Sequence, residues 1–178
     1  MILHPWHEVS PGDQSPHVIR AIVEIPRGSR TKYEVDKASG LIKVDRVLYG
    51  SMCYPINYGF IPQSLGDDLD PLDILVLSCM DFVPLSIVDA RVVGIMQMID
   101  GGKMDDKIIA VAVNDPTVNH YQSVADLPPH LHIELRNFFE QYTKLEGKTV
   151  VVNEFLPVAD AIEVINRSFE FYKTYFGK

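Results

Sequence analysis

The chain has 178 residues, 47% of them hydrophobic, and a formal net charge of −8 at pH 7. This length and apolar content predict one domain, residues 1–178, and a charged fraction of 22% argues against disorder. The acidic balance argues against a nucleic-acid partner, because proteins that bind duplexes usually present a basic face.

Residues 1–17 are rich in Pro, His and Gly and predict an irregular N-terminal arm. They lack the basic segment and apolar run of a secretion signal, so we expect a cytoplasmic protein. No apolar run in the chain reaches the ~20 residues of a membrane-spanning helix, so we expect no membrane partner.

Short runs rich in β-branched residues then predict a series of strands. These cover residues 18–25, 32–36, 41–44, 74–77, 90–99, 108–113 and 149–155. Ser39-Gly40 predicts a hairpin between the second and third of them. For residues 49–66, which are rich in aromatic residues, Gly and Pro, we predict neither strand nor helix.

Apolar residues recur at helical spacing over residues 131–145 and 162–176, which predicts two amphipathic helices. Many strands followed by helices indicate an α+β domain that is mainly β, with a closed or sandwiched antiparallel sheet flanked by two helices. Cys53 and Cys79 lie in apolar stretches and are predicted to be buried reduced thiols.

The most informative stretch is acidic: Asp67, Asp68, Asp70 and Asp73 crowd directly ahead of an apolar strand. Mutual repulsion disfavours such crowding unless cations lie among the carboxylates. Clustered carboxylates with Mg²⁺ are a usual means of handling phosphates, since hard cations take oxygen ligands. A solvated acidic turn is the alternative. An EF-hand fits poorly, because Leu72 and Asp73 stand where its loop needs Asp or Asn followed by Gly.

A second acidic group, Asp100, Asp105 and Asp106, lies in a Gly-containing loop between two predicted strands. Taken alone it is typical of a hairpin tip, and Glu24 and Glu34 alone are typical of strand surfaces.

In chain order these blocks resemble the family I soluble inorganic pyrophosphatases, from Val18 to about Leu156. The most specific block is Asp-x-Asp-Pro-x-Asp followed by an apolar residue, at Asp68–Ile74. The other matching blocks are Glu24–Pro26, Lys32–Glu34, Val44–Arg46, Tyr54–Gly59, Asp100–Lys107 and Phe138–Tyr142. His4–His7 is similar to the arm of the plant-type branch and of some bacterial relatives.

The resemblance implies a five-stranded closed OB-like β-barrel with two flanking α-helices. It also implies Mg²⁺-dependent hydrolysis of pyrophosphate, bound as its magnesium complex, to two orthophosphates. A homohexamer is the assembly it favours. The choice among Mg²⁺, Mn²⁺ and Co²⁺ stays open.

The resemblance further assigns a role to each matching residue. Asp70 accepts the proton of a metal-activated attacking water. The implied metal ligands are Asp68, Asp73, Asp100 and Asp105. The implied phosphate-binding residues are Lys32, Arg46, Tyr58, Lys107 and Tyr142. Glu24, Glu34, Tyr54 and Asn57 are implied as supporting residues.

Two positions depart from the family pattern. Thr143 stands where many relatives have Lys, and Lys144 cannot take over, because one helical residue turns the side chain by ~100°. Leu69 replaces a small or polar residue. Two other functions stay open: an OB-type oligonucleotide-binding module, and a pyrophosphatase relative that has lost activity and serves as a structural or regulatory subunit.

Overall fold

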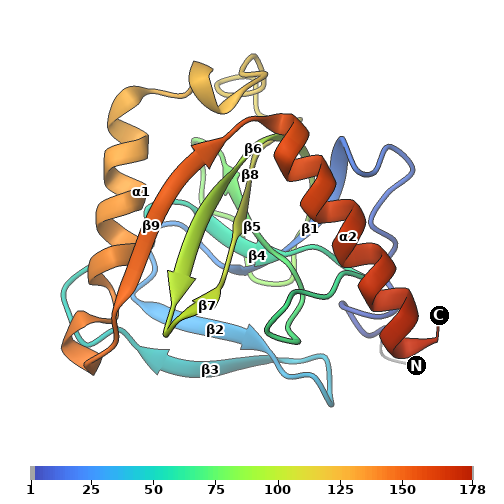
Figure 1. Ribbon diagram of the computed structural model, residues 1–178, viewed down its shortest axis with the longest axis horizontal. Coiled ribbons are helices and arrows are strands. Elements are labelled where there is room, and N and C mark those ends of the chain that lie inside the picture. The colour runs from blue at the N-terminus through green and yellow to red at the C-terminus, as the bar shows by residue number, and fades with distance from the viewer. Residues whose placement is uncertain (1–2, 178) are drawn as a thin grey trace.

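The fold is organised around one long strand, β6 (Ile87–Asp100), in the computed structural model (Figure 1). The structure describes residues 3–177; Met1, Ile2 and Lys178, at the ends of the predicted arm and domain, lie outside the described residues. The other strands are β1 (Val18–Ile25), β2 (Thr31–Val35), β3 (Ile42–Val47), β4 (Asn57–Phe60), β5 (Asp73–Leu77), β7 (Lys103–Met104), β8 (Lys107–Ala112) and β9 (Val150–Leu156). The helices are α1 (Pro129–Gln141) and α2 (Val158–Phe176), and single 3-10 turns cover Val124–Asp126 and Lys144–Glu146.

Five strands close into a ring in the order β1, β4, β5, β8 and β6, and β6 pairs again with β1. The predicted mainly-β class, with a closed OB-like barrel and two helices, is confirmed. The expectation of a wholly antiparallel sheet is wrong for one pair, because β5 runs parallel to β8. The chain reverses direction from β5 to β6 and again from β6 to β8, so β5 and β8 point the same way. Because β8 lies between β5 and β6 in the sheet, it pairs parallel with β5 and antiparallel with β6.

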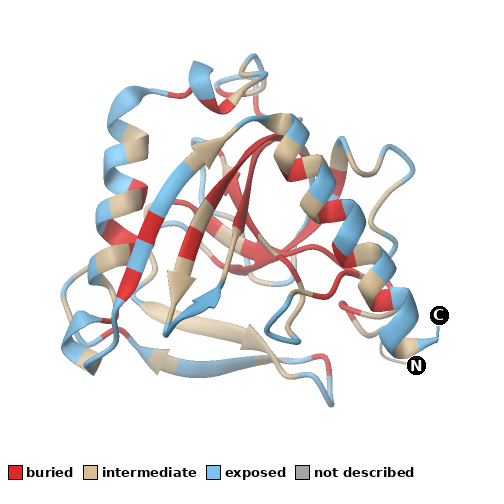
Figure 2. Ribbon diagram, viewed as in Figure 1, coloured by how far each residue is buried: buried red, intermediate tan, exposed pale blue. Residues whose placement is uncertain are grey.

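The buried residues concentrate on the ring strands, whereas the β2–β3 hairpin is partly exposed (Figure 2). Every residue of β8 is buried, because one side of the strand belongs to the apolar cluster that includes α1 and the other side to the cluster that includes α2. On α1, Leu135, Phe138 and Phe139 form the buried stripe at the helical spacing that the sequence predicts. Helices α1 and α2 and strand β9 cover the outside of the ring (Figure 1).

Three expectations need correction. The first predicted helix ends at Gln141, and a 3-10 turn follows where the pattern continues to residue 145. β4 is a strand in a segment for which none was predicted. Cys53 and Cys79 are both exposed free thiols rather than buried ones, because each lies in a connection between strands where the residue beside it, Tyr54 or Ser78, takes the buried position.

Gly59 explains why β4 escaped prediction. A Cβ atom at this position would lie 1.9 Å from the carbonyl oxygen of Ile22 and 2.9 Å from the Cα of Val23, so β4 approaches β1 more closely than any side chain allows. Glycine has low strand propensity, and its presence here reflects this tertiary contact rather than a local preference.

We therefore predict that Gly59→Ala lowers the free energy of unfolding by about 3 kcal/mol or more, because two backbones must separate. Gly50→Ala is the matched control, since its Cβ would meet Leu145 Cδ1 at 3.8 Å and the Met52 nitrogen at 4.0 Å, both ordinary contacts. Urea unfolding of both variants measures the difference. Equal stability of the two would contradict the close approach of β4 and β1.

Candidate active site

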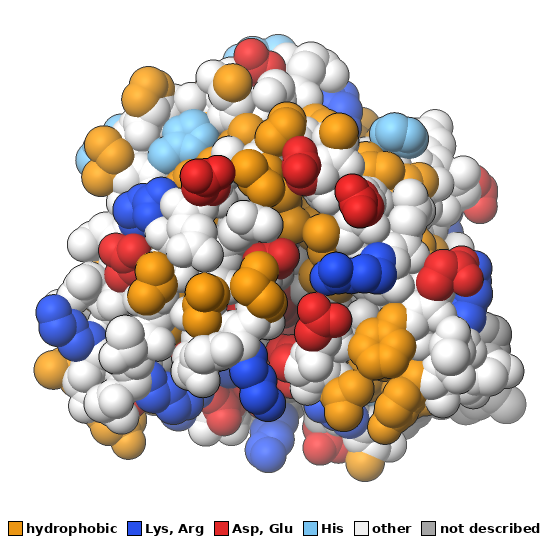
Figure 3. All heavy atoms as spheres, in the orientation of Figure 1, with side chains coloured by type: hydrophobic (Ala, Val, Ile, Leu, Met, Phe, Trp, Pro, Cys, Tyr) orange, Lys and Arg blue, Asp and Glu red, His pale blue; other side chains and the backbone are white. Residues whose placement is uncertain are grey.

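A cavity of about 310 Å³ lies between the β2–β3 hairpin, the ring and the end of α1. Its lining includes every residue to which the resemblance assigns a role except Arg46 and Asn57, namely Glu24, Lys32, Glu34, Tyr54, Tyr58, Asp68, Asp70, Asp73, Asp100, Asp105, Lys107 and Tyr142. On the face drawn in Figure 3, acidic side chains lie in a depression below the centre and basic side chains stand around it. Residues from distant parts of the sequence therefore meet in one place.

The parallel pairing of β5 and β8 creates the centre of this cavity. Asp73 is the first residue of β5 and Lys107 the first of β8, and the register pairs Ile74 with Ile108, so both first residues lie at the same edge. Lys107 Nζ lies 2.5 Å from Asp73 Oδ2 and 2.5 Å from Asp105 Oδ1. The Lys107 side chain is 3% exposed, so this ammonium group is buried between two carboxylates.

The loop ahead of β5 brings Asp68 and Asp70 to the same cavity. Asp68 Oδ1 accepts a hydrogen bond from the Asp70 N–H at 3.0 Å, and the Gly66 N–H donates to the Asp70 carbonyl at 2.7 Å. Leu69 between them has φ 68°, in the left-handed region that costs a residue with a Cβ about 1–2 kcal/mol. This backbone conformation gives a physical reason for a preference for small or polar residues at position 69.

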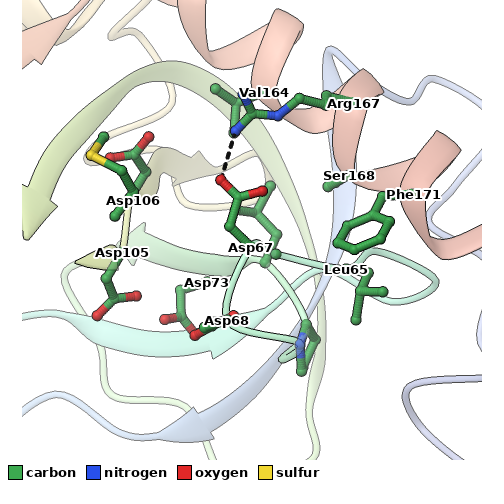
Figure 4. Close-up of a pocket in the computed structure, with 14 residues that line it drawn as sticks. Leu65, Asp67, Asp68, Asp73, Asp105, Asp106, Val164, Arg167, Ser168 and Phe171 are labelled. Carbon is green, nitrogen blue, oxygen red and sulfur yellow. Dashed lines mark hydrogen bonds and ion pairs between the residues drawn. The ribbon is translucent and has the colours of Figure 1, made fainter. Parts of the chain in front are cut away.

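A second cavity of about 290 Å³ lies on the other side of this loop (Figure 4). Asp68, Asp73 and Asp105 line both cavities. Asp67, in contrast, points toward α2, where its Oδ2 lies 3.4 Å from Arg167 Nη2 (Figure 4). The four carboxylates of the loop thus separate, and Asp67 is the one that turns away from the first cavity.

The basic residues of the hairpin are held by carboxylates. Lys32 Nζ lies 2.5 Å from Glu34 Oε1 and 3.6 Å from Asp45 Oδ2. Arg46 Nε donates to Glu146 Oε1 at 2.9 Å, and its Nη1 pairs with Asp45. Arg46 therefore lies beside the cavity, with its donors directed at two carboxylates, and does not belong to the lining in this structure.

Asn57 and Tyr54 support the cavity from behind. Asn57 is fully buried: its Oδ1 accepts from the Arg27 and Phe82 N–H groups, and its Nδ2 donates to the Val76 and Met80 carbonyls. The Tyr54 ring packs edge-on against two cavity rings, those of Tyr58 at 5.7 Å and Tyr142 at 6.4 Å. These contacts fix the backbone at the start of β4 and orient the tyrosines.

Burial, with repulsion between carboxylates as a smaller cause, shifts pKa values in the lining. Burial raises the pKa of Glu24 to about 8. Repulsion from Asp73 and Glu34 adds to this rise, whereas the hydrogen bond from the Val35 N–H opposes it. Burial also raises the pKa of Asp73, although Lys107 opposes this. The cavity carries more negative charge than its own cations neutralise.

The donor set fits a hard divalent cation, because it consists of carboxylate oxygens around a negatively charged cavity. Within residues 3–177, no three Asp, Glu, His or Cys side chains are already grouped to hold one ion. Between Asp73 and Asp105 the ammonium group of Lys107 supplies the positive charge instead.

Comparison with known proteins identifies the family. The family model described as inorganic pyrophosphatase matches residues 21–173. The chain belongs to the inorganic pyrophosphatase family. It is 54% identical to the soluble inorganic pyrophosphatase of Oryza sativa subsp. indica, over 97% of this chain and 80% of that protein. It is 50% identical to soluble inorganic pyrophosphatase 1 of Arabidopsis thaliana, over 97% and 81% of the two chains.

Solved structures agree with this family membership. The inorganic pyrophosphatase of Thermus thermophilus superimposes with a TM-score of 0.90 at 41% identity, over 93% of this chain and 97% of that chain. That of Helicobacter pylori gives 0.85 at 43% identity, over 88% and 94%. Separately, within the described part of the chain, no helix combines the length and apolar character needed to cross a membrane.

Lys37 and Trp6 also line the cavity, although the sequence assigns neither of them a role. Lys37, just after β2, pairs through its Nζ with Asp70 Oδ1. Trp6 lies in the N-terminal arm. Lys37 carries no signal beyond an ordinary turn lysine, whereas a lone tryptophan in an irregular arm is a signal, because so large an apolar side chain needs a surface to cover it.

The raised pKa of Glu24 predicts a pH dependence of stability in the metal-free protein. In the folded protein the Glu24 carboxyl keeps its proton up to about pH 8, whereas in the unfolded chain it loses the proton near the ordinary pKa of 4.5. The contribution of neutral Glu24 to the free energy of unfolding is therefore fully present below pH 4.5 and is lost as the pH rises from there through 8. Glu24→Gln should therefore gain stability relative to the unsubstituted protein as the pH rises. Unfolding in EDTA at several pH values between about 4.5 and 8 tests this, and parallel curves for the two proteins would refute it.

Proposed function

We propose that this inorganic pyrophosphatase family member hydrolyses pyrophosphate to two orthophosphates in a Mg²⁺-dependent reaction. The observation that carries the proposal is the convergence of Asp68, Asp70, Asp73 and Asp105 with Lys107 in one cavity. Pyrophosphate is itself an anion, so an acidic cavity can accept it only together with cations, and we propose its magnesium complex as the substrate.

Asp68, Asp73, Asp100 and Asp105 are the residues that we propose to hold Mg²⁺, with Glu24 and Glu34 completing the acidic wall. All six line the cavity. When bound, the metal neutralises the carboxylates and lowers the pKa of a coordinated water. Lys107 would then shift its interaction from the carboxylates toward a phosphate oxygen, a short movement because its ammonium group already lies among the ligands.

Asp70 is the proposed general base. Its side chain is 50% exposed on the cavity wall and faces Lys37, so it can reach a water in the cavity. The water oxygen forms a bond to one phosphorus, its proton passes to Asp70, and the bond from that phosphorus to the bridging oxygen breaks, releasing the second phosphate with its electron pair. This direct attack needs no covalent intermediate with the protein.

Lys32, Lys107, Tyr58 and Tyr142 are the proposed phosphate-binding residues. Lys107 lies 5.7 Å from the centre of the Tyr58 ring, so a cation and a hydroxyl donor are presented side by side. Positive charge and donors that face the leaving phosphate stabilise the loose transition state of phosphoryl transfer. Arg46 can join them only by releasing Asp45 or Glu146.

Thr143 does not replace the lysine that many relatives carry. It is buried at 1% exposure, and within residues 3–177 its Oγ1 has no hydrogen-bond partner. Lys144 Nζ lies 3.2 Å from Gln141 Oε1 on the exposed side of the turn. Neither residue belongs to the cavity lining, so we propose that the site works with one phosphate contact fewer.

The remaining proposals concern the setting of the enzyme. We propose a single domain, a cytoplasmic location and a homohexamer, with neither a nucleic-acid nor a membrane partner. The acidic cavity and the net charge of −8 argue against an oligonucleotide-binding module. Phosphate release from pyrophosphate with Mg²⁺, abolished by EDTA, separates an active enzyme from an inactive relative.

Asp70→Asn should lower kcat by about 10²–10⁴-fold, because the variant keeps the size of the side chain but cannot accept the proton. Asp67→Asn is the matched control in the same loop, since Asp67 faces Arg167 in the second cavity. Phosphate release at saturating magnesium pyrophosphate measures both. Near-normal turnover of Asp70→Asn, or an equal loss in Asp67→Asn, would rule out Asp70 as the base.

Mg²⁺ should also stabilise the protein against unfolding, by about 2.7 kcal/mol at a free concentration 100 times the dissociation constant. Asp73→Asn should lose most of this stabilisation, because Asp73 lies at the centre of the proposed ligand set. Thermal unfolding with increasing Mg²⁺ measures it. An unchanged Mg²⁺ response in Asp73→Asn would remove this residue from the ligand set.

A further inference from the structure

The N-terminal arm is bonded to the start of the acidic loop through Trp6. Trp6 is 4% exposed, its indole Nε1 donates to the Ser64 carbonyl at 2.8 Å, and its own carbonyl accepts from the Gln63 N–H at 2.8 Å. The Gln63 side chain adds a bond to the His7 carbonyl at 3.4 Å. Two bonds thus tie this one arm residue to residues 63–64.

Ser64 joins both ends of the loop that carries Asp68 and Asp70. It is fully buried, and its Oγ accepts from the Leu72 N–H at 2.9 Å while donating to the Ile61 carbonyl at 2.6 Å. A shift of Ser64 therefore moves both the entry and the exit of the loop.

On its other side the arm is anchored to α2. The Trp6 ring packs edge-on against Phe176 at 5.4 Å, and His7 Nδ1 lies 2.6 Å from the Tyr172 hydroxyl. Tyr172 packs in the same apolar cluster as Leu65, but within residues 3–177 its hydroxyl bonds to His7 and to no residue of 63–72, so removal of this hydroxyl weakens the arm without removing a bond to the loop.

The arm also reaches the opposite wall of the cavity. His4 Nε2 lies 3.1 Å from the carbonyl of Lys37, whose ammonium group pairs with Asp70. A Cβ on Gly40 would lie 2.9 Å from Pro5 Cδ, so the arm packs closely on the tip of the β2–β3 hairpin. The arm therefore connects the two segments, hairpin and acidic loop, that face each other across the cavity.

We propose that Trp6 is a positioning residue for the hydrolysis reaction. Through Ser64 it fixes the loop, and hence the places of Asp68 and Asp70 relative to Asp73. The proposal rests on the function proposed above and adds to it a residue to which the family resemblance assigns no role. Trp6 also borders the cavity, so its indole lies near the place where ligands would bind.

Trp6→Phe removes the indole N–H but keeps an aromatic ring against α2. It should raise the Mg²⁺ concentration for half-maximal activity and lower kcat, each by about three- to tenfold, the factors expected for loss of one hydrogen bond. KM for magnesium pyrophosphate should stay within about twofold, because the proposed phosphate-binding residues lie on other elements. A KM effect alone would contradict the proposal.

Tyr172→Phe is the matched control, because it removes one hydrogen bond between the same arm and α2. It should leave kcat and the Mg²⁺ requirement within about twofold. Equal changes in the two variants would show that the arm acts only through general stability. No change in kcat or in the Mg²⁺ requirement of Trp6→Phe would contradict the proposal.

Fluorescence gives a readout that does not depend on activity, since Trp6 is the only tryptophan of the chain. Addition of Mg²⁺, and then of imidodiphosphate as a hydrolysis-resistant analogue, should change the emission of the unsubstituted protein at the concentrations that govern activity. Unchanged emission at saturating Mg²⁺ and imidodiphosphate would overturn the proposal. This measurement uses the unsubstituted protein, so it holds even if Trp6→Phe fails to fold. Absence of Mg²⁺-dependent phosphate release in the unsubstituted protein would instead refute the proposed function.

Discussion

A buried lysine between two aspartates holds the centre of this molecule together. Lys107 is almost inaccessible, and its ammonium group contacts both Asp73 and Asp105. Removing one partner of such a group leaves a buried charge uncompensated, at a cost of about 3–5 kcal/mol. The parallel pairing of β5 with β8 places these charges together, and it follows from the insertion of β8 between β5 and β6. Topology thus creates a charge cluster that no local segment could form.

The same cluster explains why the proposed chemistry needs cations. Burial raises the pKa values of Glu24 and Asp73, and repulsion from neighbouring carboxylates adds to both shifts, so ionising these groups in the folded protein is costly. In the proposed function, a divalent metal would supply positive charge among these carboxylates and so allow an anionic substrate to enter the cavity. In the structure the Lys107 ammonium group fills part of this role, so binding of metal and repositioning of Lys107 are linked in our account. The N-terminal arm adds a second constraint, because Trp6 is bonded to residues 63–64 at the start of the loop that carries the proposed ligand Asp68.

Much of the fold could be predicted from the sequence, for reasons that particular elements make clear. β1 was predicted with its observed bounds, since its β-branched run is long and ends at Pro26. β4 escaped because its Asn and Gly are selected by long-range contacts: Asn57 holds four backbone groups, and Gly59 admits the β1 backbone. The cysteines were misplaced because an apolar neighbourhood in sequence does not reveal which residues of a turn face outward. For the site, the order of the motifs predicted roles for most polar residues of the cavity lining. It predicted none for Lys37 or Trp6, because their positions depend on how the hairpin and the arm fold back.

The most direct test is a crystal structure grown with Mn²⁺, whose anomalous scattering marks the metal positions. The account predicts anomalous peaks in the first cavity, with ligands among Asp68, Asp73 and Asp105, and the Lys107 ammonium group displaced from at least one of its two aspartates. Peaks confined to other sites, with Lys107 still bridging Asp73 and Asp105, would contradict it.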